Sequence, residues 1–144
     1  DLRPFVGRVV ELTGILAADG STIAVDSLVQ ATEVFRASGD TSIGRDIQFR
    51  IDVPGASRWY LYAAFGPGMM PLESLMPFGS GTIWMDPSAI VTLGLDAFVR
   101  TWQGRLTVPN EPALVGLSVW FQGAVHTIPG PLKFLNAAKV TILP

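Results

Sequence analysis

The side chain best suited to acid–base chemistry is the single histidine, His126. A Ser-His-Asp triad would have to use it as the general base, with Ser80, Ser88 or Ser118 as the nucleophile. Neither Ser80 nor Ser118 lies in the Gly-x-Ser-x-Gly spacing that exposes a nucleophile on a sharp turn. A lone histidine near the end of a predicted strand is more often a surface or cross-strand residue. We therefore expect no enzyme activity and no catalytic residues.

Metal and cofactor chemistry has little support in the residue types. Zinc sites take about four nitrogen or sulfur ligands, whereas this chain has one His and no Cys. Calcium would need clustered oxygen ligands, but the Asp residues are dispersed and no loop has the Asp spacing of a calcium-binding hand. We predict no metal and no cofactor. The carboxylates weighed for calcium are Asp19, Asp26, Asp40, Asp46, Asp52, Asp86 and Asp96.

Charge, the length of apolar stretches and the lack of cysteine argue against a nucleic-acid partner, a membrane span and thiol chemistry. The formal net charge is −2, and the ten Lys and Arg residues are scattered rather than gathered into a stripe for phosphates. No apolar stretch approaches the roughly 20 residues that span a bilayer. The absence of cysteine excludes disulfides and thiol catalysis as well.

Tryptophan offers a binding alternative, because the apolar face of a sugar ring packs well on an indole. The candidates for such stacking are Trp59, Trp84, Trp102 and Trp120. Trp59 and Tyr60 are adjacent on a predicted strand and must point to opposite faces, so we expect one of them in the core. Carbohydrate binding by exposed Trp and Tyr side chains is therefore the second function to consider, with carbohydrate as its partner.

Apolar composition favours self-assembly as the first function. Hydrophobic residues make up 49% of the chain and charged residues 15%, against about 25% charged in typical domains. A segment rich in Gly and Pro, residues 66–81, carries many apolar side chains that something must cover. A neighbouring copy of the chain or the domain's own sheet could do so. The interface candidates are Met69, Met70, Leu72, Leu75, Met76 and Phe78.

The elements that would position these residues are strands. Residues 46–53 alternate apolar and polar without exception, which predicts a half-buried strand, and Pro54-Gly55 predicts a turn after it. Residues 58–65 are apolar on both faces and predict a central strand that is covered twice. Residues 8–16 and 22–29 flank an Asp-Gly turn and predict a hairpin. We expect residues 66–81 to form a long loop with a short helical turn near residues 72–75.

Further short strands follow along the rest of the chain. They are predicted at residues 82–85, 90–95, 105–108, 114–127 and 139–143, whereas residues 98–103 are ambiguous. About eight or nine strands with turn signals every 8–12 residues predict an all-β fold, an antiparallel β-sandwich of jelly-roll or Ig-like type. At 144 residues the chain predicts a single β-sandwich domain over residues 1–144.

The last third of the chain carries a recognisable pattern. It contains Pro-Asn-Glu-Pro-Ala-Leu-Val-Gly at residues 109–116, Phe-Gln-Gly-Ala at 121–124 and Asn-Ala at 136–137. This pattern resembles the C-terminal β-sandwich domain of secreted planctomycete and myxobacterial proteins, a family without a settled activity. The resemblance is loose over residues 39–143 and tighter over 105–142, where Ile128 and Leu135 depart from the family pattern.

A secreted, extracellular protein is what the resemblance implies. The sequence begins at Asp1 rather than Met, which is expected if a signal peptide has been removed or if the chain has been trimmed, and we favour removal. We therefore predict a non-catalytic secreted structural protein, a self-assembling subunit of an extracellular filament, surface layer or shell. Its expected partners are copies of itself.

Overall fold

A computed structural model describes residues 3, 6, 10–16 and 23–144, which fall into two compact units, residues 1–32 and 33–144. In the first unit, β1 (Val10–Leu16) pairs antiparallel with β2 (Ile23–Gln30). These two strands confirm the predicted N-terminal hairpin, while its turn at residues 18–21 lies outside the described residues. The prediction of one domain over the whole chain stays a prediction.

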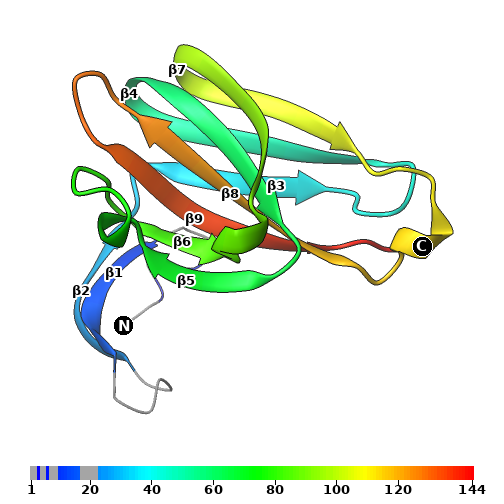
Figure 1. Cartoon of the computed structure of the whole chain (residues 1–144), viewed down its shortest axis with the longest axis horizontal. Coiled ribbons are helices and arrows are strands. Elements are labelled where there is room, and N and C mark those ends of the chain that lie inside the picture. The colour runs from blue at the N-terminus through cyan, green and yellow to red at the C-terminus, as the bar shows by residue number, and fades with distance from the viewer. Residues whose placement is uncertain (1–2, 4–5, 7–9, 17–22) are drawn as a thin grey trace. The chain divides into compact units, whose positions relative to one another are not determined.

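The second unit is an antiparallel β-sandwich, as the sequence predicted (Figure 1). Its main sheet has the order β3–β4–β8–β9, with β7 pairing along β4. The bounds of these strands are β3 (Val34–Gly39), β4 (Asp46–Ala64), β7 (Val91–Thr107), β8 (Ser118–His126) and β9 (Leu132–Thr141). Among the described residues, no helix is both long and apolar enough to cross a membrane.

The long strand β4 joins the two layers of this sandwich. Its first part, residues 46–52, pairs with β3 and β7, and its second part, residues 57–64, pairs with β7 and β8. Figure 1 shows β4 and β7 bending back together between these parts. The predicted turn at Pro54-Gly55 does not end the strand, because β4 continues through these residues, with an irregularity where the register with β7 shifts between Asp52 and Ser57.

The core lies between the two parts of β4. The alternation predicted for residues 46–53 is confirmed, because Ile47, Phe49, Ile51 and Val53 are all buried. The side chains of Phe35 and Phe121, from β3 and β8, complete the core, with the rings of Phe49 and Phe121 4.8 Å apart. Burying each such side chain stabilises the fold by about 1.5–3 kcal/mol.

A second apolar cluster covers the other face of the second layer. It comprises Ala64, Leu72, Ile83, Met85, Ala124 and Phe134. A separate antiparallel pair, β5 (Pro67–Pro71) with β6 (Thr82–Met85), contributes to this cluster. Residues 59–64 of β4 thus contact one cluster on each face, which confirms the prediction of a central strand covered twice for this part of the predicted segment. Arg58 and Phe65, at its two ends, are exposed.

Three sequence predictions about element boundaries need correction. Residues 66–81 are not all loop, because they contain β5; the short helical turn is confirmed as the 3₁₀ helix η2 (Leu72–Ser74). The strand segments predicted within residues 90–108 form one strand, β7, because pairing with both parts of β4 overrides their Gly and Asp residues. Residues 114–117 precede β8 rather than belonging to it: Leu114 ends the 3₁₀ helix η4 (Pro112–Leu114), and residues 115–117 connect that helix to β8.

Candidate functional site

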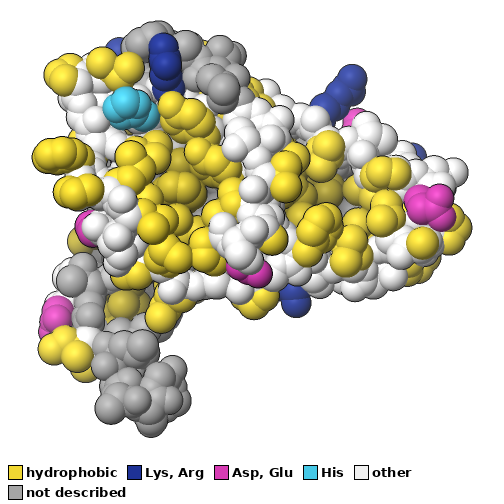
Figure 2. All heavy atoms as spheres, viewed as in Figure 1, with side chains coloured by type: hydrophobic (Ala, Val, Ile, Leu, Met, Phe, Trp, Pro, Cys, Tyr) yellow, Lys and Arg dark blue, Asp and Glu magenta, His cyan; other side chains and the backbone are white. Residues whose placement is uncertain are grey.

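Several large apolar side chains on the segment from β5 to β6 are exposed to solvent. Five of them are between 42% and 84% exposed: Met69, Leu75, Met76, Phe78 and Trp84. We call these five residues the outer apolar surface. Figure 2 shows hydrophobic side chains gathered on the face where β5 and β6 lie, with few charged side chains between them. Such a concentration of exposed apolar side chains marks a contact surface more often than a free one.

The structure separates the six predicted interface residues into two groups. Leu72 is buried and Met70 is half-buried, both against the second apolar cluster. Met69, Leu75, Met76 and Phe78 point away from it and are exposed. On β5 this follows from the two-residue period of a strand, since Met69 and Met70 are neighbours and must face opposite sides. Phe78 also lines a shallow depression with Pro77, Gly79, Ser80, Gly130 and Pro131.

A buried side-chain amide holds this surface to the sandwich. Gln122 on β8 is fully buried, and its Nε2 donates to the carbonyl oxygens of Thr82 at 2.7 Å and Leu135 at 2.6 Å. Its Oε1 accepts a hydrogen bond from the backbone N–H of Trp84 at 3.0 Å. The side-chain amide of Gln122 thus joins β6 and β9 to β8. These hydrogen bonds hold β6, and with it Trp84 of the outer apolar surface, in place against the sandwich.

One of the four tryptophans is buried. Trp59 is 5% exposed, and its ring stacks on that of Trp102 with centroids 3.8 Å apart, so Trp59 offers no face to a sugar. The prediction that Trp59 or Tyr60 lies in the core is confirmed by this burial. Trp102 and Trp120 are half-buried. Trp84 is exposed and stacks on no other ring among the described residues.

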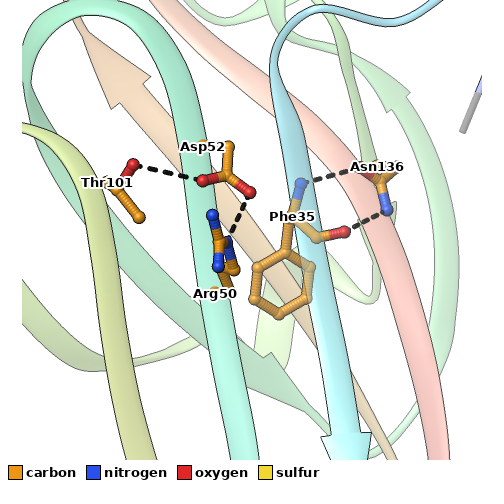
Figure 3. A network of polar contacts seen from close by, with 5 residues as sticks. All are labelled: Phe35, Arg50, Asp52, Thr101 and Asn136. Atoms are coloured by element: carbon orange, nitrogen blue, oxygen red, sulfur yellow. Dashed lines mark hydrogen bonds and ion pairs between the residues drawn. The ribbon is translucent and has the colours of Figure 1, made fainter.

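A polar surface occupies the outer face of β4 and its neighbours. Arg50 Nε donates to Asp52 Oδ2 at 2.7 Å, and Thr101 Oγ1 donates to Asp52 Oδ1 at 3.2 Å (Figure 3). The hydrogen bond from Arg50 is the main cause that lowers the pKa of Asp52 below its ordinary value. Nearby, Arg105 lies 3.7 Å from Asp46. Each of these two arginines therefore faces a carboxylate, which makes this a balanced rather than a basic surface.

The carboxylates weighed for calcium act within turns and strands. The backbone N–H of Ser42 donates a hydrogen bond to Asp40 and lowers the pKa of that carboxyl. The pKa of Asp86 is lowered by hydrogen bonds from the hydroxyl and then the backbone N–H of Ser88. Asp46 accepts from Thr107 across the sheet. Asp26 is exposed on β2. Asp19 and the side chain of Asp96 lie outside the described part of the chain, within which no three metal-ligating side chains come together.

The serines considered as nucleophiles do not meet His126. Ser118 begins β8 and His126 ends it, so their Cα atoms are about 25 Å apart along the strand. Ser88 hydrogen-bonds to Asp86 instead. Ser80 lies beyond β9, since its N–H bonds to Leu132 O, and Leu132 in turn pairs with His126. The geometry brings none of these pairs together as a nucleophile and base.

The structural roles of Asn136 and Gln122 are not predicted from the sequence. Asn136 on β9 donates from Nδ2 to Phe35 O at 2.7 Å and accepts at Oδ1 from Phe35 N at 3.0 Å, which joins β9 to β3 (Figure 3). Gln122 plays the corresponding part between β6 and β8. A signal was available for Gln122, because it is one polar residue inside an apolar strand and such a residue needs hydrogen-bond partners.

Comparison with protein-family models, curated proteins and solved structures found no match for this chain. The resemblance to secreted β-sandwich domains over residues 105–142 therefore stays a prediction from its motif.

Proposed function

We propose that this protein is a non-catalytic structural subunit that self-associates through its outer apolar surface, as part of an extracellular filament, surface layer or shell. The observation that carries the proposal is the exposure of five large apolar side chains between residues 69 and 84. The likeness of residues 105–142 to secreted β-sandwich domains supports an extracellular location.

A second copy of the chain suits the outer apolar surface because this surface carries very few charged side chains. Residues 65–85 carry a single charged side chain, Glu73. Two copies can therefore approach without strong like-charge repulsion, and the cores of protein interfaces are depleted of charged residues in the same way. Aromatic and Met side chains, here Phe78, Trp84, Met69 and Met76, are the types enriched at such cores.

The expected strength of association follows from the exposed apolar area. Removing a large apolar side chain from water contributes about 1.5–3 kcal/mol, so five half-exposed ones contribute about 6 kcal/mol. Association costs about 4–15 kcal/mol in lost translational and rotational freedom. The two terms are comparable, so this surface alone supports weak, concentration-dependent association. Tight assembly would need contacts beyond these five residues.

Substitution of the outer apolar surface tests the proposal. The double variant Met69→Ser/Phe78→Ser should remain folded, because both side chains are exposed, and should lose association in sedimentation velocity. Leu143→Ser is the matched control, since Leu143 is 50% exposed but lies outside the 69–84 segment. Equal association of the double variant and the control would contradict this assignment of the interface.

Carbohydrate binding is the alternative, and the exposure of Trp84 is the observation in its favour. A glycan array would show binding that Trp84→Ala abolishes. Binding retained in Trp84→Ala, or no glycan bound, would remove Trp84 as the stacking residue.

A further inference from the structure

The last part of β7 has an open edge. Its only strand partner among the described residues is β4, which pairs along one side of it (Figure 1). Just after β7, the N–H of Val108 donates to Arg45 O at 2.8 Å, so the backbone groups of Val108 point toward β4. These groups alternate in direction along a strand, and the pairing is regular from Asp46 to Asp52. The β7 residues whose backbone groups point away from β4 are therefore Thr101, Gln103, Arg105 and Thr107.

The opposite edge of the same layer is capped, whereas the β7 edge is not. By the same alternation, both backbone groups of Phe35 on β3 point away from β4, and there Asn136 binds them. The outward backbone groups of β7 have no such partner among the described residues. Residues 99–107 also contain neither Pro nor Lys, two residue types that commonly block pairing at an edge. This edge is thus a template for one more strand.

The hairpin β1–β2 is a strand pair that lacks a third strand. It belongs to a compact unit of its own, and two-stranded sheets of this kind are at best marginally stable alone in water. Its exposed apolar side chains are Leu12, Ile15, Val25 and Val29. Each of its strands pairs only with the other among the described residues, so each has a free edge. The hairpin can therefore supply the strand that the β7 edge accepts.

Charge makes the hairpin and the β7 edge complementary. Residues 10–30 carry Glu11, Asp19 and Asp26 but no Lys or Arg. Residues 97–107 carry Arg100 and Arg105 but no Asp or Glu. Opposite charges on paired strands stabilise the pairing, whereas like charges destabilise it. The hairpin thus suits this edge better than a second β7 does.

The linker after β2 is too short to bring the hairpin of the same chain to this edge. Residues 31–33 join Gln30 to Val34, and Val34, Asp52 and Thr101 lie in one row across β3, β4 and β7. A strand added beyond Thr101 would lie three strand spacings from β3, about 14 Å. Four extended residues span at most about 14 Å, and only along a straight line through the sheet itself. The strand must therefore come from another copy.

We infer that the hairpin β1–β2 of one copy adds to the open edge of β7 in a second copy. Main-chain hydrogen bonds would provide the affinity, and Arg100 and Arg105 would select the acidic hairpin. The inference rests on the proposed function, because its partner is another copy of the chain. Hairpin and edge are different surfaces, so the contact is head-to-tail and repeats along a filament. It adds to the contact through the outer apolar surface and is weak without it.

Hydrogen exchange of single amides tests this strand addition. In concentrated wild-type protein, the amides of Thr101, Gln103 and Arg105 should exchange at least about tenfold more slowly than in dilute protein. The amides of Trp102 and Gly104 point toward β4 and should exchange equally slowly at both concentrations. A response at every second residue is specific to a paired strand. Absence of this slowing in concentrated protein would overturn the inference; if that protein still associates, the proposed function stands.

Charge reversal tests whether the hairpin is the added strand. Asp26 and Arg100 are both exposed, so Asp26→Lys and Arg100→Glu should fold normally. Each should reduce the slowing at least about twofold, because it places like charges on the paired strands. The double variant Asp26→Lys/Arg100→Glu should restore it. Slowing that neither single variant reduces would mean that another strand occupies the edge, and would overturn the inference.

Met69→Ser/Phe78→Ser separates this inference from the proposed function. Its hairpin and β7 are intact, so the alternating slowing should persist in concentrated protein, although more weakly than in wild type. Persistent slowing in a variant that also associates as strongly as wild type in sedimentation would support the strand addition and contradict the role of the outer apolar surface.

Discussion

The side-chain amide of Asn136 hydrogen-bonds to both backbone groups of Phe35, at 2.7 Å and 3.0 Å. It links β9 to β3 without a strand pairing, because the side chain of Asn136 satisfies the backbone N–H and carbonyl of Phe35. The ring of Phe35 is at the same time one of the most buried side chains of the core. The residue that Asn136 ties to β9 is therefore also a residue that packs in the core.

Removal of this amide should destabilise the fold. Asn136→Ala leaves the N–H and carbonyl of Phe35 without their partner, and we expect a loss of about 1–3 kcal/mol in the free energy of unfolding. Urea denaturation of the variant and wild type measures it. Asn110→Ala, at an exposed position between β7 and η4, serves as the control and should change stability by less than about 0.5 kcal/mol. Equal stability of the two variants would contradict the role of Asn136.

Gln122 should matter more, because it satisfies three backbone groups at once. Gln122→Met keeps a similar volume but leaves Thr82 O, Leu135 O and Trp84 N unbonded, and we expect a loss of about 3 kcal/mol or more. Gln103→Met makes the same chemical change at an exposed position on β7. Thermal unfolding followed by circular dichroism should show a lowered Tm for Gln122→Met alone.

Close packing of Gly104 on Trp102 predicts a clear difference between two glycines. Gly104→Ala places a methyl group against the Trp102 ring and should destabilise the protein by about 1–3 kcal/mol. At Gly55 nothing lies within 4 Å of an added Cβ, so Gly55→Ala should be close to neutral. Near-UV circular dichroism should also change for Gly104→Ala, since the stacked indoles must shift. An unchanged near-UV spectrum would argue against this packing.

Asp52 should contribute to the pH dependence of stability. Its pKa is lowered from the usual 3.8, first by the hydrogen bond from Arg50. A carboxyl with a lowered pKa in the folded state stabilises the fold above its unfolded pKa, and that stabilisation disappears as the pH falls through the folded value. Asp52→Asn should therefore lose less stability than wild type on acidification from about pH 5 to about pH 2.

Glu111→Gln, which removes an exposed carboxyl in the same unit, is the matched control for the Asp52 experiment. The difference from wild type in acid-induced loss should be larger for Asp52→Asn than for Glu111→Gln. If the two variants follow the same pH profile, the Arg50–Asp52 contact contributes nothing to folding.

Strands with regular alternation could be predicted from the sequence, and strands defined by their partners could not. The alternation of apolar and polar side chains over residues 46–53 predicts a strand with one buried face, and the structure has that strand. The bend at Pro54-Gly55 looks like a turn locally, but pairing with β7 on both sides keeps β4 continuous. Likewise, Gly94 and Gly104 interrupt the pattern of β7, although they are required by the rings of Trp59 and Trp102.

The candidate surface was predictable in composition but not in detail. The sequence shows that residues 66–81 carry an excess of apolar side chains. Burial of Leu72 and exposure of Phe78 depend on which side of β5 and η2 faces β8 and β9, and only the tertiary arrangement decides that.

The mass of the chain in solution tests self-association most directly. Light scattering after size-exclusion chromatography, repeated over a hundredfold range of concentration, should give a mass above 15.4 kDa that rises with concentration. A mass of 15.4 kDa at every concentration would contradict the proposal that this protein is a self-assembling subunit.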